Sequence, residues 1–146
     1  MNKIIFPIFA ILIAVVLAGC NSSSRTLSQP EGKIIVDDAS YLMIQSNYEW
    51  KEGDIEIKTQ SSPDVYELVD YFKTLEVEKG DILKFEIDKN PTSITVTKLN
   101  EDGSIDNVEI KDNKITAPSK EGYYIYELHT IWDRGKENFV FDINVK

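Results

Sequence analysis

Apolar and polar residues alternate along most of the chain after residue 33, a period of two that is typical of β-strands with one buried face. The longest alternation lies in the C-terminal third. One face is expected to carry Tyr124, Tyr126, Leu128 and Trp132, and the other Tyr123, Ile125, Glu127, His129 and Ile131. After a turn at residues 133–136, the pattern returns with Phe139, Phe141, Ile143 and Val145. The sequence therefore predicts two long paired strands in this region.

Shorter alternating segments precede this hairpin. Leu42, Ile44, Tyr48 and Trp50 are predicted to share one face of a strand whose register loosens near Ser46. A turn at residues 52–54 then leads to a strand with Ile55 and Ile57, and residues 79–81 mark a hairpin or a tight corner. Further short strands are expected over residues 75–77, 83–87, 94–97, 108–110 and near residue 115.

One segment, residues 62–73, has a helical period instead. Its apolar residues at i, i+3, i+4 and i+7 are Val65, Leu68, Val69 and Phe72. Ser62 suits the N-cap, Pro63 the first helical position, and Asp64 the positive end of the helix dipole. The sequence predicts one short helix or helical turn that crosses between sheets.

About eight short strands, with turns between them and no repeated helices, predict an all-β antiparallel sandwich over residues 33–146. The segment Gly122 to Tyr126 resembles the start of the penultimate strand of immunoglobulin-like domains, where a small residue and a tyrosine form a corner and a core residue follows. Tyr126 stands at that core position in place of cysteine, so the resemblance implies an immunoglobulin-like sandwich without the inter-sheet disulfide.

The first 24 residues have the features of an export signal. Lys3 precedes an uncharged run of 15 residues, Ile4 to Ala18, shorter than the roughly 20 that span a bilayer as a helix. Leu17-Ala18-Gly19-Cys20 resembles the lipobox of bacterial lipoproteins. The resemblance implies that residues 1–19 are a cleaved signal peptide and that the Cys20 thiol receives diacylglycerol, with fatty acids such as palmitate.

The lipoprotein resemblance also implies a location and a tether. Residues 20–32, rich in Ser with Gln, Pro and Gly, are expected to form a flexible tether after the lipidated cysteine. The domain would stand on the extracellular face of the cell membrane, held by the lipid anchor on Cys20. With its many Ile, Lys, Asn and Asp, the whole resembles a small surface lipoprotein of Gram-positive bacteria.

Charge and composition exclude several classes of partner. The chain has 16 Lys and Arg against 25 Asp and Glu, a net charge of −9, and removal of residues 1–19 with Lys3 makes it −10. A chain of this charge repels phosphate backbones, so nucleic acid is not an expected partner. Zinc prefers Cys and His ligands. With one histidine and one acylated cysteine, we expect neither a metal nor another cofactor.

Catalytic chemistry finds little support in the sequence. His129 has no motif partner and is expected on the face opposite Tyr126, without a catalytic role. Residues 98–109 fall close to the calcium loop of an EF-hand, but Lys98 replaces the first carboxylate, which favours an ordinary hairpin turn. Paired carboxylates for glycoside hydrolysis stay open, because their geometry comes from the fold.

Aromatic residues leave one candidate for ligand binding. Trp50, Tyr124, Tyr126 and Trp132 are expected to fill the core because they follow the inward period. Tyr66 and Tyr123 are expected to be exposed, where aromatic side chains can bind carbohydrate or peptide.

The expected function follows from location and fold class. We expect a non-enzymatic module, held at the membrane, that binds a protein or an envelope polymer. The alternative is an inhibitor or regulatory ectodomain that acts on a surface protease or sensor. An enzyme would require a concave pocket with two carboxylates of separated pKa.

Overall fold

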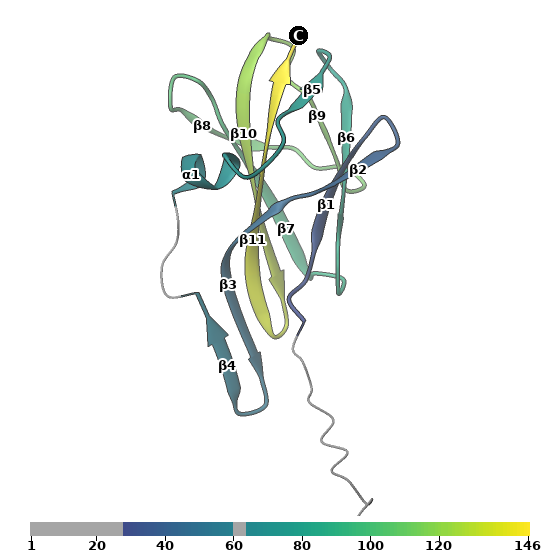
Figure 1. The fold of residues 1–146 in the computed structure, drawn as a ribbon. Coiled ribbons are helices and arrows are strands. Elements are labelled where there is room, and N and C mark those ends of the chain that lie inside the picture. The colour runs from purple at the N-terminus through teal and green to yellow at the C-terminus, as the bar shows by residue number, and fades with distance from the viewer. Residues whose placement is uncertain (1–27, 60–63) are drawn as a thin grey trace, which may run out of the picture.

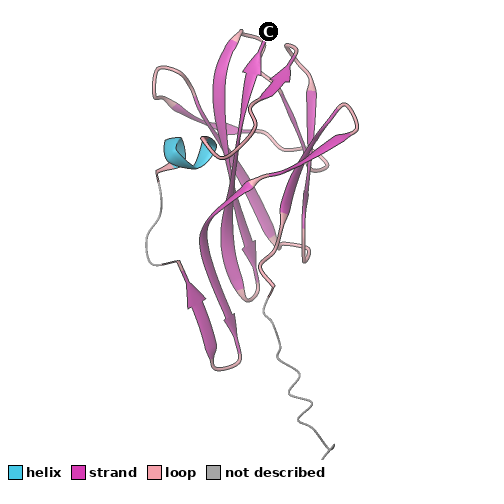
Figure 2. Ribbon diagram, viewed as in Figure 1, coloured by secondary structure: helices cyan, strands magenta, loops and turns pink. Residues whose placement is uncertain are grey.

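The computed structural model describes residues 28–59 and 64–146, whose strands and single short helix are drawn in Figures 1 and 2. The predicted lipobox, Leu17, Ala18, Gly19 and Cys20, lies outside the described residues, as do Ser62 and Pro63. No helix in the described part of the chain has the length and apolar content needed to cross a bilayer.

Two β-sheets form the fold. Sheet A has the order β2 (Ala39–Leu42), β1 (Gly32–Val36), β6 (Ile82–Ile87) and β9 (Lys114–Thr116). Sheet B has the order β4 (Ile55–Lys58), β3 (Ile44–Glu52), β11 (Gly135–Val145), β10 (Gly122–Trp132), β7 (Ser93–Leu99) and β8 (Ile105–Val108). A short strand, β5 (Leu75–Val77), pairs in parallel with the end of β11, and all other strand pairs are antiparallel.

The all-β, mainly antiparallel sandwich that the alternation predicted is confirmed. The expected number of strands, about eight, is too low, because the described residues form eleven. Strands β5 and β9 lie where short strands were expected, whereas β1 and β2 were not separated from the segment that leads into β3.

The core lies between the two sheets. Phe85 and Leu83 from sheet A and Phe141 from sheet B have no exposed surface. Aromatic rings fill much of the space: Tyr126 stacks on Phe141 with centroids 5.0 Å apart. The four aromatic residues predicted in the core are buried, with exposed fractions of 6% for Trp50, 7% for Tyr124, 1% for Tyr126 and 6% for Trp132.

Strand β3 contains a bulge near the predicted position. Ser46 pairs with Asn138 and Glu49 with Lys136, so β3 has one residue more than β11 between these pairs. Asn47 takes up the extra length with a φ of +46°, which asparagine tolerates better than most residues. The bulge reverses the alternation, and the predicted common face is therefore wrong: Tyr48 lies in the core, whereas Ile44 packs on the outer face of sheet B.

The helical segment forms α1 (Val65–Val69), shorter than predicted. Asp64, not Ser62, is its N-cap, with the carboxylate accepting a hydrogen bond of 3.0 Å from the backbone N–H of Tyr66. Leu68 and Val69 pack against apolar side chains on the outer face of sheet B. Strands β4 and β5, on either side of α1 in the sequence, both belong to sheet B. The prediction that the helix crosses between sheets is therefore wrong. The chain passes from sheet B to sheet A at the corner between β5 and β6.

The sandwich has two distinct poles. At the entry pole, the β10–β11 turn lies beside the β6–β7 turn, through a 2.7 Å hydrogen bond from Thr92 N to Ile131 O. The described chain enters there, since Asp88 N donates to Glu31 O at 2.9 Å. Residues 117–122, the β5–β6 corner and the end of β11 form the far pole (Figure 1). Strand β10 spans about 33 Å between the poles.

Candidate functional site

A groove of about 470 Å³ opens at the far pole, between the β7–β8 turn and the connection from β9 to β10. We call it the far-pole groove. Its walls are formed by Lys98, Asn100, Glu101, Asp102, Pro118, Ser119, Lys120, Glu121 and Tyr124. Two segments distant in the sequence, residues 98–102 and 118–124, meet here because β7 and β10 are neighbours in sheet B.

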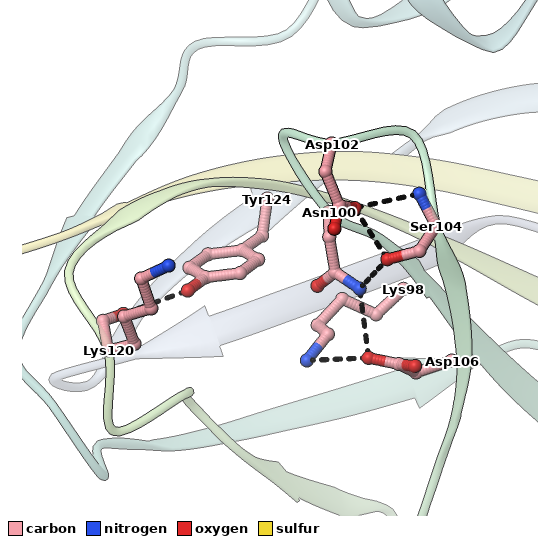
Figure 3. Close-up of polar contacts among 7 residues, drawn as sticks. All are labelled: Lys98, Asn100, Asp102, Ser104, Asp106, Lys120 and Tyr124. Carbon is pink, nitrogen blue, oxygen red and sulfur yellow. Dashed lines mark hydrogen bonds and ion pairs between the residues drawn. The ribbon is translucent and has the colours of Figure 1, made fainter.

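Tyr124 links the groove to the core. Its ring is buried, and its hydroxyl donates a 2.9 Å hydrogen bond to the carbonyl of Lys120, which fixes the connection before β10. The ammonium of Lys98 lies 5.3 Å from the centre of the same ring. Figure 3 shows the Lys98 side chain extending toward Asp106, whose carboxylate lies 3.4 Å from Nζ. The Lys98 ammonium is therefore held at one side of the groove by the Tyr124 ring and the Asp106 carboxylate.

The β7–β8 turn beside the groove is ordered by its own polar side chains (Figure 3). Asp102 accepts two hydrogen bonds from Ser104, one from the backbone N–H and one from the hydroxyl, and these lower the pKa of Asp102. Asn100 donates to Asp106 at 2.9 Å, which is the main cause of a lowered pKa for Asp106. Both carboxylates are thus kept ionised by neighbouring donors.

The resemblance of residues 98–109 to a calcium loop has no structural counterpart in the flanking elements. The segment joins strands β7 and β8, whereas EF-hand loops join helices. Lys98 supplies the cation beside Asp106. No group of three or more His, Cys, Asp or Glu side chains suited to hold a metal ion is found within residues 28–59 and 64–146.

Acidic and basic groups alternate along the rim of the far-pole groove. Glu101 accepts a 3.0 Å hydrogen bond from the backbone N–H of Tyr123, and Glu121 pairs with Lys79 at 2.7 Å. The Lys79 ammonium lowers the pKa of Glu121. Charged side chains of both signs therefore line the groove beside the buried ring of Tyr124.

His129 lies beside a second groove, on the outer face of sheet B, also of about 470 Å³. As the alternation predicted, its side chain is on the face opposite Tyr126. Nε2 lies 3.4 Å from the Thr97 hydroxyl and 3.9 Å from Glu127, whose carboxylate also accepts a 3.0 Å hydrogen bond from Asn138. The imidazole thus belongs to a polar patch of neighbouring strands.

The two tyrosines predicted to be exposed differ in the structure. Tyr66 lies on α1 and is 53% exposed. Tyr123 is half-buried beside the helix, and its hydroxyl donates a 2.6 Å hydrogen bond to Asp142. Burial, followed by this hydrogen bond to the carboxylate, raises the pKa of Tyr123. Neither residue lines the far-pole groove.

Two buried carboxylates were not recognised in the sequence. Asp142 accepts hydrogen bonds from Tyr123 and, at 2.8 Å, from Thr74. Glu137 is fully buried on the inward face of β11, and neither of its oxygens has a hydrogen-bond partner among the described residues. The period of two could have indicated Glu137, since it stands two residues before Phe139. Burial raises the pKa of Glu137 to about 8.

Compared with models of protein families, with curated proteins and with solved structures, the chain finds no match in any of the three.

Proposed function

We propose that the chain is an extracellular lipoprotein of the cell membrane, anchored through Cys20, whose immunoglobulin-like domain binds a protein or an envelope polymer and catalyses no reaction. The anchor rests on the lipobox-like residues Leu17 to Cys20 after an apolar run of 15 residues. The binding role is supported by the far-pole groove, which is lined by charged side chains of both signs and by Tyr124. Residues 1–19 would be removed as the signal peptide.

Strand order and one hydrogen bond support the immunoglobulin-like assignment. In such domains, the last two strands share a sheet with the strand called C, while strands B and E lie in the other sheet. Here β10 and β11 share sheet B with β7, and β6 pairs with β9 in sheet A. Tyr124 stands at the start of the penultimate strand and bonds back to the carbonyl of Lys120, the geometry of a tyrosine corner.

The opposite positions of the chain entry and the far-pole groove are the observation that carries the proposed function. The described chain enters at the entry pole, and the far-pole groove opens about 33 Å away, at the other end of β10. A domain tethered by Cys20 would thus present the groove away from the membrane, toward the wall or a neighbouring ectodomain.

The test is photo-crosslinking in intact cells of the native host, with the full-length chain. A photo-reactive amino acid in place of Lys120 reports on the groove, and the same residue in place of Arg134 reports on the entry pole. We expect a reproducible adduct from position 120, little from position 134, and loss of the adduct together with release from the membrane in Cys20→Ala. A protein adduct would favour the regulatory or inhibitory role; a polymer adduct would favour envelope binding.

Two results would overturn the proposal in separable ways. Absence of a lipid group on Cys20 of the membrane-bound chain, measured by mass spectrometry, would exclude the lipid anchor. Equal adducts from positions 120 and 134 would exclude the far-pole groove as the binding surface.

A further inference from the structure

The hairpin of β3 and β4 presents an edge strand that has one neighbour in the part of the chain that the structure describes. Within residues 28–59 and 64–146, β4 pairs with β3 alone, and all four of its residues are exposed. Figure 1 shows this hairpin projecting beyond the body of the sandwich. Ile55 is 55% exposed and Ile57 38%. An exposed edge strand with apolar side chains is a template for pairing with another strand.

Two hydrogen bonds establish which backbone groups point to the free edge. Thr59 N donates to Tyr48 O at 2.8 Å, toward β3, and Lys51 N donates to Arg134 O at 2.7 Å, away from β4. Backbone groups alternate in direction along a strand. Ile55 and Ile57 therefore direct their N–H and C=O groups toward β3, whereas Glu56 and Lys58 direct theirs toward the free edge.

We propose that β4 pairs antiparallel with β4 of a second copy of this chain, around a two-fold axis through Ile57. In this register Ile57 faces Ile57 of the second copy, and Glu56 of each chain faces Lys58 of the other. The outward N–H and C=O groups of Glu56 and Lys58 then form hydrogen bonds between the copies, so that two sheets B become one continuous sheet. The two-fold contact is self-complementary, as isologous interfaces must be.

Side-chain chemistry fits a copy of the chain better than an unrelated strand. Glu56 and Lys58 lie on one face, 2.8 Å apart, and pair with opposite charges when the strand meets itself antiparallel. Ile55 and Ile57 lie on the other face, on the same side as Trp50. The central Ile57 pair is not hydrogen-bonded, which is the position where facing side chains come closest, with Cα atoms about 4.5 Å apart.

The edge at the opposite side of sheet B lacks this complementarity. Strand β8 also carries an exposed isoleucine, Ile105, which is 64% exposed. Its one charged residue, Asp106, has no basic residue within the strand to face in a second copy. Strand β8 therefore provides a matched control.

The contact is small, so the test traps it covalently. A four-residue edge buries far less than the roughly 1,200 Å² of a stable interface. We would express the full-length chain with Ile57→Cys, oxidise whole cells and measure the disulfide-linked dimer on non-reducing gels. Cα atoms about 4.5 Å apart allow a disulfide. We expect about tenfold more dimer than with Ile105→Cys, because disulfide formation requires this close approach.

Charge reversal tests the register. Glu56→Lys, added to Ile57→Cys, places lysine opposite lysine between the copies and is expected to reduce the dimer severalfold. Lys58→Glu in addition restores opposite charges and is expected to restore the dimer. The parent chain, whose one cysteine is Cys20, measures any dimer formed through that thiol, which separates this test from the proposed lipid anchor.

Three results would overturn the pairing. They are equal dimer from Ile57→Cys and Ile105→Cys, no response to the charge reversals, or a disulfide adduct of Ile57→Cys with a different protein in place of the dimer.

Discussion

Glu137 is a carboxyl group in an apolar setting. The charge of Lys89 opposes the pKa increase, and Glu137 in turn helps to raise the pKa of Tyr48, whose hydroxyl is also buried without a partner among the described residues. The Lys89 ammonium itself lies 5.1 Å from the centre of the Trp50 ring and contacts the carbonyl of Ser28. Because no group of residues 28–59 and 64–146 forms a hydrogen bond with the Glu137 carboxyl, its neutral form is favoured in the folded state.

The raised pKa of Glu137 predicts how stability depends on pH. Below pH 4.5 the group is protonated in both states; between 4.5 and about 8 the unfolded chain releases the proton and the folded chain keeps it. Each unit of pH in this window therefore lowers the free energy of unfolding by about 1.4 kcal/mol. The free energy of unfolding of Glu137→Gln should exceed that of the parent by about 3 kcal/mol at pH 7 and differ little from it at pH 4.5.

Urea denaturation at a series of pH values, followed by tryptophan fluorescence, measures this difference. Glu109→Gln, at an exposed position, is the control and should not remove the loss of stability toward higher pH. A constant difference between Glu137→Gln and the parent from pH 4.5 to 8 would show that Glu137 does not titrate in this range.

At the scale of elements, the β3–β4 hairpin joins the rest of sheet B through a close backbone contact. A Cβ atom on Gly135 would lie 2.2 Å from the carbonyl oxygen of Glu49 and 2.7 Å from the Trp50 ring. Backbone atoms cannot yield as a side chain can, so β3 and β11 approach closely only because residue 135 has no side chain. At the bulge, the left-handed backbone conformation of Asn47 accommodates the extra residue of β3, so that β3 and β11 stay paired on both sides of it.

Gly135→Ala is therefore expected to reduce the free energy of unfolding by about 2 kcal/mol, as overpacking does in other proteins. Trp50 and Trp132 lie on either side of this contact, with ring centroids 5.7 Å apart, so their fluorescence should report the change. The exposed neighbour gives the control: Lys136→Ala should alter stability by less than about 0.5 kcal/mol. Equal stabilities for the two variants would contradict the close contact.

The sequence predicted faces of strands better than their partners. Burial of Tyr126 and the partial exposure of Glu127 after it follow from a local period, which explains why β10 and β11 were located correctly. Pairing is a contact between distant residues, so nothing local indicates that Leu75 joins Ile143 in parallel. The far-pole groove was missed for the same reason, since Lys98 and Lys120 come together only through the pairing of β7 with β10.

At the scale of the whole molecule, the point where the described chain enters the sandwich and the far-pole groove lie at opposite poles. The Lys120 connection belongs to the far pole, and the turn at Asp133 and Arg134 belongs to the entry pole. If Cys20 is lipidated, the long axis of the sandwich stands away from the bilayer, and the turn at residue 133 lies nearer the lipid than the connection at residue 119.

Energy transfer to a membrane dye tests this orientation. Donor dyes attached through Asp133→Cys and Ser119→Cys differ in position by about 33 Å along β10, so transfer should be clearly stronger from position 133. The parent chain, labelled in the same way, corrects for dye on Cys20. Equal transfer from both positions would indicate a sandwich that lies flat on the membrane.

The place of β11 in sheet B has a consequence for biosynthesis. Strand β11 pairs with β3, β5 and β10, yet it is translated after all three. The residues between Glu52 and Gly135 take on the order of ten seconds to synthesise. During that interval β3 and β5 lack their common partner, so sheet B is completed, and the sandwich closes, only after β11 has been synthesised.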